Sequence, residues 1–323
     1  MAMSMPMPKI TNASAPPADH PALHGLAVLQ RGWLSSNNVV LQGQGSGAVL
    51  VDTGHVVHAA QTLALVQRAL AGERLETILN THLHSDHCGG NACLQASLGG
   101  RITVPSTSFA AAQAWDEDRL SYRHSGQRCQ RFRPDAALAP GQQLRAGDRQ
   151  WQALAAPGHD PDSLLLFDAQ HGLLISADAL WENGFGVVFP ELEGNPGFDD
   201  VAAVLDLIES LQACCVIPGH GAPFVDVPGA LHRARMRLAA FRADPARHRR
   251  HGIKVLVKYH LMEEQRQSWP DFLHWFSTTP LSQSIWLHLG RPEGIIAAFG
   301  EHIVQELLRG GVVNSRDGQL FDV

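Results

Sequence analysis

The stretch THLHSDH, residues 81–87, decides how this sequence of 323 residues is interpreted. It carries four potential metal ligands within six residues, and it directly follows residues 75–80, whose apolar and β-branched character predicts a strand. Loops at the carboxyl end of a strand are where α/β folds place functional groups. His82 and His84 flank one residue, so an extended backbone points both side chains the same way. One metal ion could hardly accept all four ligands from so tight a segment, so the stretch predicts two neighbouring ions.

Three more potential ligands follow predicted strands later in the chain. His159 and His220 each come after a Pro-Gly pair at the end of a strand, and Asp178 ends another strand. A glycine before a ligand lets the backbone turn sharply and approach closely. Imidazole and carboxylate groups without thiolate suit Zn²⁺, or Fe or Mn, at an open catalytic site. The predicted ligands are His82, His84, Asp86, His87, His159, Asp178 and His220.

Strands and helices alternate through the first two thirds of the chain. Short apolar runs predict strands at 26–29, 38–41, 47–53, 75–80, 101–104, 151–155, 163–167, 172–176 and 214–217, with a hairpin turn at His171-Gly172. Apolar residues at helical spacing predict helices at 56–70 and 199–211. This mixture of hairpins and βα units predicts an α/β or α+β fold in which helices pack on sheets.

The pattern changes near Val227, after which helix follows helix. Helices are predicted at 231–241, 253–264, 269–276 and 295–308, and a small hairpin is predicted around Arg316-Asp317-Gly318. Gly300 is a residue type that can interrupt the last of these helices. Helices followed by a two-stranded wing resemble a winged-helix module. We therefore expect a flexible N-terminal segment at 1–21, a catalytic domain at 22–226 and a helical, winged-helix-like C-terminal domain at 227–323.

Five ordered motifs make the chain resemble the metallo-β-lactamase superfamily. They are VDTG at 51–54, HLHSDH at 82–87, PGH at 157–159, AD at 177–178 and PGHG at 218–221. The resemblance covers roughly residues 25 to 226 and implies an αββα sandwich with its site at one edge between two sheets. It also implies the roles of the ligands: His82, His84 and His159 hold one metal ion, Asp86, His87 and His220 hold the other, and Asp178 bridges them. By the same resemblance, Asp52 orients the ligand loop through hydrogen bonds.

This ligand set predicts a hydrolase that uses a metal-bound hydroxide. Metal binding lowers the pKa of water towards about 7, and Asp86 is expected to orient the nucleophile and take up its proton. The resemblance places a bridging aspartate such as Asp178 in glyoxalase II-like thioesterases, lactonases, phosphodiesterases and nucleases. True β-lactamases of the superfamily usually lack it. We therefore expect an ester or thioester substrate, and two divalent ions among which Zn²⁺ is preferred to Fe or Mn.

Two segments are expected to form the substrate wall. Residues 106–143 are too many for a simple connection, and residues 181–198 combine aromatic side chains with several glycines. Aromatic and apolar lining suits an organic substrate, although such loops also pack on their own domain. The expected pocket residues are Trp115, Tyr122, Trp181, Phe185 and Phe189.

Two other functions remain open at the level of sequence. Nine basic residues and one acidic residue lie between Leu231 and His260, in a chain whose net charge is −6. The region from Arg233 to Lys258 would suit a phosphate backbone, or it is a solvated helix face. With the winged-helix-like tail it resembles the β-lactamase-like protein 2 group, which makes a phosphodiesterase or ribonuclease the alternative. A non-catalytic binding module of the same fold is the third hypothesis, and the complete ligand set argues against it.

Composition sets the expected compartment and partners. Hydrophobic residues make up 45% of the chain, which is enough for a full core. No stretch approaches the roughly 18 to 20 apolar residues that a membrane helix needs. The five cysteines form no CxxC pair, and residues 1–21 lack the apolar run of a signal peptide. We expect a cytoplasmic protein without membrane partners, whose apolar C-terminal helices can pair two chains in a homodimer.

Overall fold

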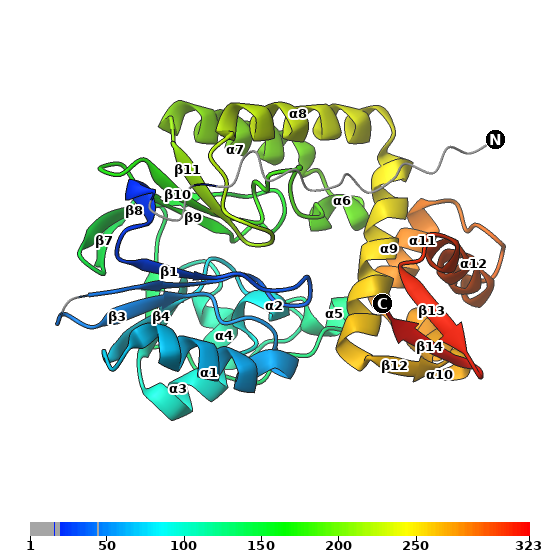
Figure 1. Cartoon of the computed structure of the whole chain (residues 1–323). Coiled ribbons are helices and arrows are strands. Elements are labelled where there is room, and N and C mark those ends of the chain that lie inside the picture. Colours follow the sequence, from blue (N-terminus) through cyan, green and yellow to red (C-terminus); the bar gives the residue numbers. More distant parts are fainter. Residues whose placement is uncertain (1–15, 17–19, 44) are drawn as a thin grey trace.

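Two β-sheets stacked face to face form the centre of the computed structural model, which describes residues 16, 20–43 and 45–323 (Figure 1). The segment 1–21, expected to be flexible, lies almost entirely outside the described residues. The first sheet has the strand order β1-β2-β3-β4-β5-β6, antiparallel from β1 to β3 and parallel from β3 to β6. Its strands are β1 (Leu26–Leu29), β2 (Asn38–Leu41), β3 (Ala48–Val51), β4 (Leu75–Leu79), β5 (Arg101–Pro105) and β6 (Ala136–Leu138).

The second sheet has the order β11-β10-β9-β8-β7 and is antiparallel except for the parallel pair β10 and β11. Its strands are β7 (Gln143–Ala146), β8 (Arg149–Ala155), β9 (Leu164–Asp168), β10 (Leu173–Ala177) and β11 (Cys215–Pro218). The hairpin between β9 and β10, predicted at His171-Gly172, is confirmed. Strands β6 and β7 were not predicted, because they are short edge strands and their exposed residues break any apolar pattern.

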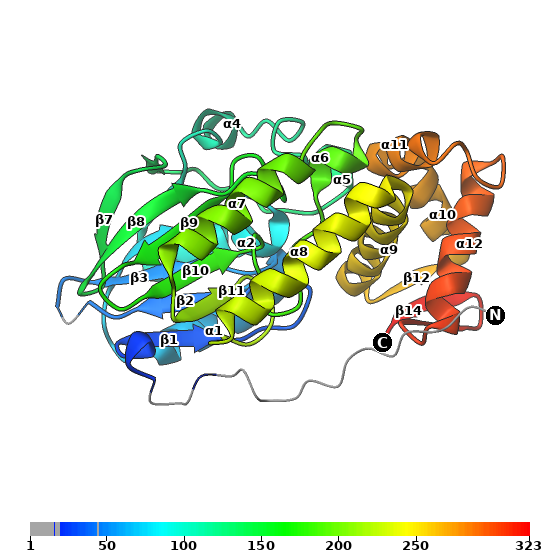
Figure 2. The ribbon, with the colours of Figure 1, turned by 90° about the horizontal axis from the view of Figure 1, so that it is seen from above.

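Helices cover the outer face of each sheet, as Figures 1 and 2 show. The helices α1 (Ala59–Leu70) and α3 (Asn91–Leu98) pack on the first sheet, and α7 (Phe198–Leu211) and α8 (Val227–Ala243) pack on the second. Alternate strand residues serve different layers because side chains in a strand point to opposite faces. Val39 and Leu41 face Trp151 and Leu166 across the sandwich, whereas Val40 faces α1 and α3. The expected αββα arrangement is confirmed.

Short helices complete this part of the chain and carry its connections. They are the 3₁₀ turns η2 (Pro21–Leu23) and η3 (Val56–His58) and the helices α2 (Ser85–Cys88), α4 (Phe109–Ala114), α5 (Tyr122–Ser125) and α6 (Phe189–Leu192). The segment 106–143 therefore contains α4, α5 and β6. None of the helices within residues 16, 20–43 and 45–323 combines the length and apolar character that crossing a lipid bilayer requires.

The C-terminal part has its own apolar core, in which Phe272, Phe276 and Phe299 are fully buried. Its elements are α9 (Pro245–Glu264), β12 (Arg266–Ser268), α10 (Trp269–Thr278), α11 (Pro280–His288), α12 (Ile296–Arg309), β13 (Val313–Arg316) and β14 (Gln319–Asp322). The predicted hairpin is present as β13 and β14, and β12, which the sequence did not predict, joins it in the order β12-β14-β13.

Gly300 does not interrupt α12, which runs unbroken from Ile296 to Arg309. A Cβ atom at Gly300 would lie 2.8 Å from the ring of Phe276. The absence of a side chain at Gly300 therefore allows α12 to approach α10 closely, and the packing of the two helices outweighs the low helix propensity of glycine.

Candidate metal centre

The ligand loop, residues 81–87, begins two residues after β4 ends and turns into the short helix α2. Its start is held by Asp52, which follows β3. One Asp52 carboxylate oxygen accepts from the backbone N–H of Thr81 at 2.9 Å, and the other accepts from the Thr81 hydroxyl at 2.8 Å. Asp52 adopts a φ of 56°, in the left-handed region that non-glycine residues seldom occupy. The chain thus accepts backbone strain at the point where Asp52 supports the loop.

Three histidines converge in the first ligand group. The Nε2 atom of His82 lies 3.1 Å from Nδ1 of His84, which lies 2.9 Å from Nε2 of His159. The Nδ1 atom of His159 is 2.6 Å from the carbonyl oxygen of Val187, so it carries the proton and leaves Nε2 free to bind a metal. Burial lowers the pKa of His84 and of His159 to about 4. The rings are therefore neutral and offer lone pairs.

The second ligand group contains Asp86, His87, Asp178 and His220. The Nε2 atom of His220 lies 3.0 Å from Asp86 Oδ2, and that of His87 lies 3.6 Å from Asp178 Oδ1. Asp178 links this group to the first, because its Oδ2 atom is 3.4 Å from Nε2 of His159. The structure thus brings all seven predicted residues together, and each is buried.

Two backbone features place Asp178 and His220 side by side. Ala177, at the end of β10, has a φ of 46°, which turns the following Asp178 into the site. Gly219 precedes His220, and a Cβ atom at Gly219 would lie 2.1 Å from Asp178 Oδ1. No other residue type fits at position 219 while Asp178 keeps its place.

The donor set fits divalent metal ions. The Nδ1 atom of His87 lies 2.8 Å from Asp52 Oδ2, so Nδ1 carries a proton, and Nε2 faces the carboxylates of Asp86 and Asp178. That Nε2 atom is buried and has no hydrogen-bond partner among the described residues. Leaving a buried polar atom unpaired costs about 1–3 kcal/mol, and a metal ion bound there removes this cost. Nitrogen and oxygen donors without sulfur are the set that Zn²⁺, Fe and Mn accept at catalytic sites.

Two of the five predicted pocket residues lie against the ligand groups. The Trp181 ring is 5.5 Å from the His220 ring, and its Nε1 atom donates to Asp178 Oδ1 at 3.2 Å. Phe189 lies 4.7 Å from the ring of His84 and 5.5 Å from that of His159. These two side chains form part of the wall of the site.

The other three predicted pocket residues contribute to apolar cores. Trp115 and Tyr122 pack with Phe132 in the core between the first sheet and its helices. Phe185 is 1% exposed and packs against Phe241 of α8. All three residues lie within the segments expected to form the substrate wall, but their rings point into the apolar cores and away from the ligand groups.

The sequence interpretation missed two side chains at the site. Trp33, in the connection between β1 and β2, stacks on His220 with ring centres 5.6 Å apart and is 58% exposed. Asp160 directly follows His159, and its Oδ2 atom is 3.4 Å from Nε2 of His84. A carboxylate next to a predicted ligand was a usable signal for Asp160. An aromatic residue in an irregular loop gave no comparable signal for Trp33.

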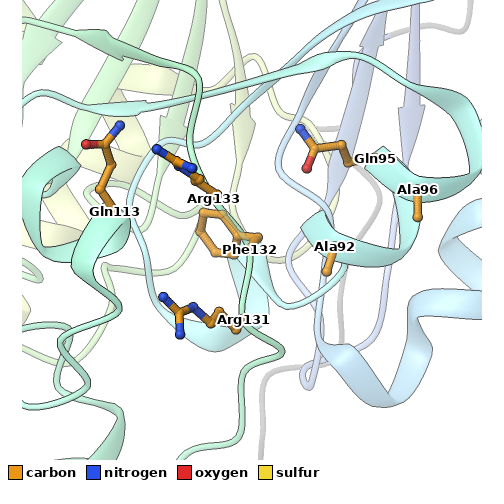
Figure 3. Close-up of a pocket in the computed structure, with 7 residues that line it drawn as sticks. All are labelled: Ala92, Gln95, Ala96, Gln113, Arg131, Phe132 and Arg133. Carbon is orange, nitrogen blue, oxygen red and sulfur yellow. The ribbon is translucent and has the colours of Figure 1, made fainter.

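A separate cavity of about 360 Å³ lies on the side of the first sheet that α3 covers (Figure 3). Its lining residues are Ala92, Gln95, Ala96, Gln113, Arg131, Phe132 and Arg133. None of the seven ligand candidates lines it, so this cavity is distinct from the metal centre.

The sequence is similar to a known protein family and to several proteins of named activity. The family model described as the metallo-β-lactamase superfamily matches residues 31–220, which is more than half of the chain. A hydroxyacylglutathione hydrolase from Anaeromyxobacter dehalogenans is 31% identical over 49% of this chain and 51% of its own length. An acyl-coenzyme A thioesterase from Gallus gallus is 28% identical over 46% of this chain and 58% of its own. The chain spans about half the length of the curated relatives it matches.

Structural similarity extends further along the chain. The crystal structure of a metallo-β-lactamase family protein from Thermus thermophilus superposes with a TM-score of 0.55 and 23% sequence identity. The superposition covers 93% of this chain and 99% of that protein. At this identity the likeness concerns the fold alone, and it includes the C-terminal part.

Proposed function

Because this chain belongs to the metallo-β-lactamase superfamily, we propose that it is a metal-dependent hydrolase whose substrates are esters or, preferably, thioesters. The observation that carries the proposal is the convergence of two buried ligand groups joined by Asp178, beside an aromatic wall. The named activities of the relatives support the choice of bond, since acyl-coenzyme A and hydroxyacylglutathione are both thioesters.

We assign one divalent ion to His82, His84 and His159 and the other to Asp86, His87 and His220, with Asp178 between them. Zn²⁺ is the proposed metal. Ions bound there supply a nucleophile at neutral pH, because they lower the pKa of water to about 7, and they polarise the carbonyl group of the substrate. The ligand assignment follows the two groups that the structure brings together.

The protein's own side chains supply orientation and proton transfer. Asp52 holds the proton on His87 Nδ1, and the Val187 carbonyl holds that on His159 Nδ1, so both Nε2 atoms face the site. The Asp86 carboxylate is proposed to orient the attacking water and to accept its proton. Trp33, Trp181 and Phe189 offer an apolar surface on which an acyl group can bind while water is excluded.

The charge distribution argues against a phosphate backbone as the substrate. At least six of the nine basic side chains between residues 231 and 260 form ion pairs with carboxylates of the chain itself. The pairs are Arg233 with Asp226, Arg235 with Asp206 and Glu209, Arg242 with Asp199, Arg250 and Lys254 with Glu306, and Lys258 with Asp322. Little of the local excess of positive charge is left for phosphates, on which nucleic-acid affinity depends.

We propose a catalytic domain, predicted at 22–226, and a winged-helix-like domain, predicted at 227–323, and we place the boundary between them after α8, because α8 packs on the second sheet. Support for the second comes from the order helix, strand, helices and hairpin between α9 and β14, and from the pairing of β12 with the hairpin strand β14. Since six of the nine basic side chains between residues 231 and 260 are paired with carboxylates, we propose that this domain contributes to the stability and positioning of the catalytic site, and that nucleic acid is not its partner.

A panel of substrates tests the proposed function. The metal-loaded protein should hydrolyse acyl thioesters, and the His84→Ala variant should not, because it lacks a ligand of the first group. Initial rates on thioesters, esters, phosphodiesters and RNA are measured with the same preparation. Turnover of phosphodiesters or RNA alone, abolished in the variant, would overturn the proposed substrate class and make the phosphodiesterase alternative correct.

Removal of the Trp33 side chain should weaken substrate binding without removing metal. Trp33→Ala is expected to raise KM for a long-chain acyl thioester roughly tenfold, equivalent to about 1.4 kcal/mol of lost binding, because an exposed ring next to His220 is lost. Metal content, measured by elemental analysis, should stay at the wild-type value. Met236→Ala is the control, since Met236 is 61% exposed on α8 outside the site. An unchanged KM in the Trp33 variant would remove this residue from the substrate wall.

A further inference from the structure

The ligand loop is contacted by the hydroxyl groups of both tyrosines in the chain. Tyr122, which lies in α5, donates to the carbonyl oxygen of Leu83 at 2.8 Å. Tyr259, which lies in α9, places its hydroxyl 2.7 Å from the Oγ atom of Ser85. Leu83 and Ser85 alternate with the predicted ligands of the loop. The two tyrosine hydroxyls therefore form hydrogen bonds with Leu83 and Ser85, the two residues of the loop that lie between the predicted ligands.

The direction of the Tyr259 hydrogen bond follows from its neighbours. The Ser85 hydroxyl lies 2.9 Å from Oε1 of Gln127, an oxygen that only accepts, so Ser85 donates to Gln127. The Ser85 oxygen is then free to accept from Tyr259. Burial raises the pKa of Tyr259 well above its usual value, which keeps the phenol protonated. Tyr259, Ser85 and Gln127 thus form a directed chain of hydrogen bonds, and Ser85 within it is fully inaccessible to solvent.

Tyr259 is itself held firmly against the catalytic part of the chain. Its ring meets the ring of His55 edge to face, with centres 5.7 Å apart. One turn further along α9, the buried Glu263 forms an ion pair with Arg128 and lies 4.0 Å from Nε2 of His55. Figure 1 shows α9 running along the side of the sandwich next to α5. These contacts give the Tyr259 hydroxyl a defined position relative to the ligand loop.

We propose that Tyr259 is a positioning residue for the metal centre, reaching it from the C-terminal part of the chain. Ser85 stands between His84, which belongs to the first ligand group, and Asp86, which belongs to the second. A single hydrogen bond from Tyr259 to Ser85 therefore sets the placement of one ligand from each group. This inference rests on the proposed metal centre and extends it. Helix α9, residues 245–264, contributes to the positions of the side chains that bind both ions.

The test is the binding of metal by Tyr259→Phe. Phenylalanine keeps the ring against His55 and removes only the hydroxyl. Loss of a residue that supports a metal ligand typically costs 10–100-fold in metal affinity, so we expect a decrease of about that size. Affinity is measured by competition with a chelator of known strength, and the visible spectrum of the Co²⁺-substituted protein should change because the ligand geometry changes. Lys258→Met is the matched control: Lys258 is the neighbouring residue of α9 and pairs with Asp322, away from the loop.

A double-mutant cycle separates positioning from a general loss of stability. Ser85→Ala removes the acceptor and should lower metal affinity to a similar extent. Adding Tyr259→Phe to it should then cost little more, because the two variants remove the same hydrogen bond. If Tyr259→Phe does not fold, Ser85→Ala is compared with Gln127→Ala, which, of the two hydrogen bonds of the Ser85 hydroxyl, removes only the one to Gln127. A larger loss of metal affinity in Ser85→Ala supports the proposal, and an equal loss in the two variants overturns it. Wild-type metal affinity in either folded single variant would overturn the proposal, whereas a wild-type protein that binds no metal would overturn the proposed function instead.

Discussion

The Asp178→Asn protein is expected to turn over thioesters about 10³-fold more slowly than the wild type and to retain one tightly bound metal ion in place of two. Asp178 lies between the two ligand groups, with its oxygens 3.4 Å from His159 Nε2 and 3.6 Å from His87 Nε2. Asparagine keeps the shape but removes the charge and one oxygen donor. A decrease in rate of roughly 10³-fold corresponds to a loss of about 4 kcal/mol of transition-state stabilisation. A bound metal ion contributes several kcal/mol to this stabilisation, so a loss of that size is expected when one ion is missing. Elemental analysis and kcat/KM measure the two effects.

Asp168→Asn provides the control for this substitution. Asp168 is another fully buried aspartate of the second sheet, but it pairs with Arg149 and His171 outside the metal centre. Its replacement should lower the thermal stability of the protein and leave two ions bound. Two bound ions and full turnover in Asp178→Asn would show that Asp178 is not a ligand.

Asp52→Ala is expected to weaken metal binding by about 10–100-fold, as is typical when a group that orients a ligand is lost. Asp52 is the partner of the proton on His87 Nδ1, and without it His87 can rotate or change tautomer. The same substitution leaves the buried N–H of Thr81 without its acceptor, which should lower the free energy of unfolding by about 1–3 kcal/mol. Chelator competition and urea denaturation of the metal-free protein measure the two effects separately.

Asp135→Ala controls for the structural part of this effect. The Asp135 carboxylate also accepts from a backbone N–H, that of Ile102 in β5, at 2.8 Å, and it lies away from the ligand loop. This variant should lose stability without losing metal affinity. If Asp52→Ala bound metal as tightly as Asp135→Ala does, Asp52 would have only a structural role.

Most of the strands and the ligand candidates were accessible from sequence because their signals are local, whereas the αββα sandwich was implied by the resemblance to the superfamily. Each predicted ligand follows a strand, and strands are recognised from a few consecutive apolar residues. Few backbone conformations allow four such closely spaced side chains to bind metal together, as His82, His84, Asp86 and His87 are proposed to do. Elements without such a local signal were missed: β6, β7 and β12 are short strands with partly exposed residues.

Packing decided the role of several residues whose type alone is ambiguous. Phe185 and Phe189 belong to one aromatic segment, yet Phe185 is buried against Phe241 while Phe189 faces His84 and His159. Gly300 is a helix breaker by type, but it lies within α12 because the helix must approach Phe276. In each case the neighbour that decides the role comes from a distant part of the chain.

By itself, then, the sequence determined a mixture of strands and helices and the seven side chains proposed to bind metal, because a strand and the turn that follows it are specified by adjacent residues. The two-layered sheet sandwich was implied by the resemblance of the five ordered motifs to the superfamily. Only the tertiary structure decided what surrounds those side chains. Tyr259 and Ser85 are 174 residues apart, and Trp33 meets His220 from a loop without regular structure. Such contacts depend on how α9 and the β1–β2 connection pack against the sandwich, which the pattern of neighbouring residues does not encode.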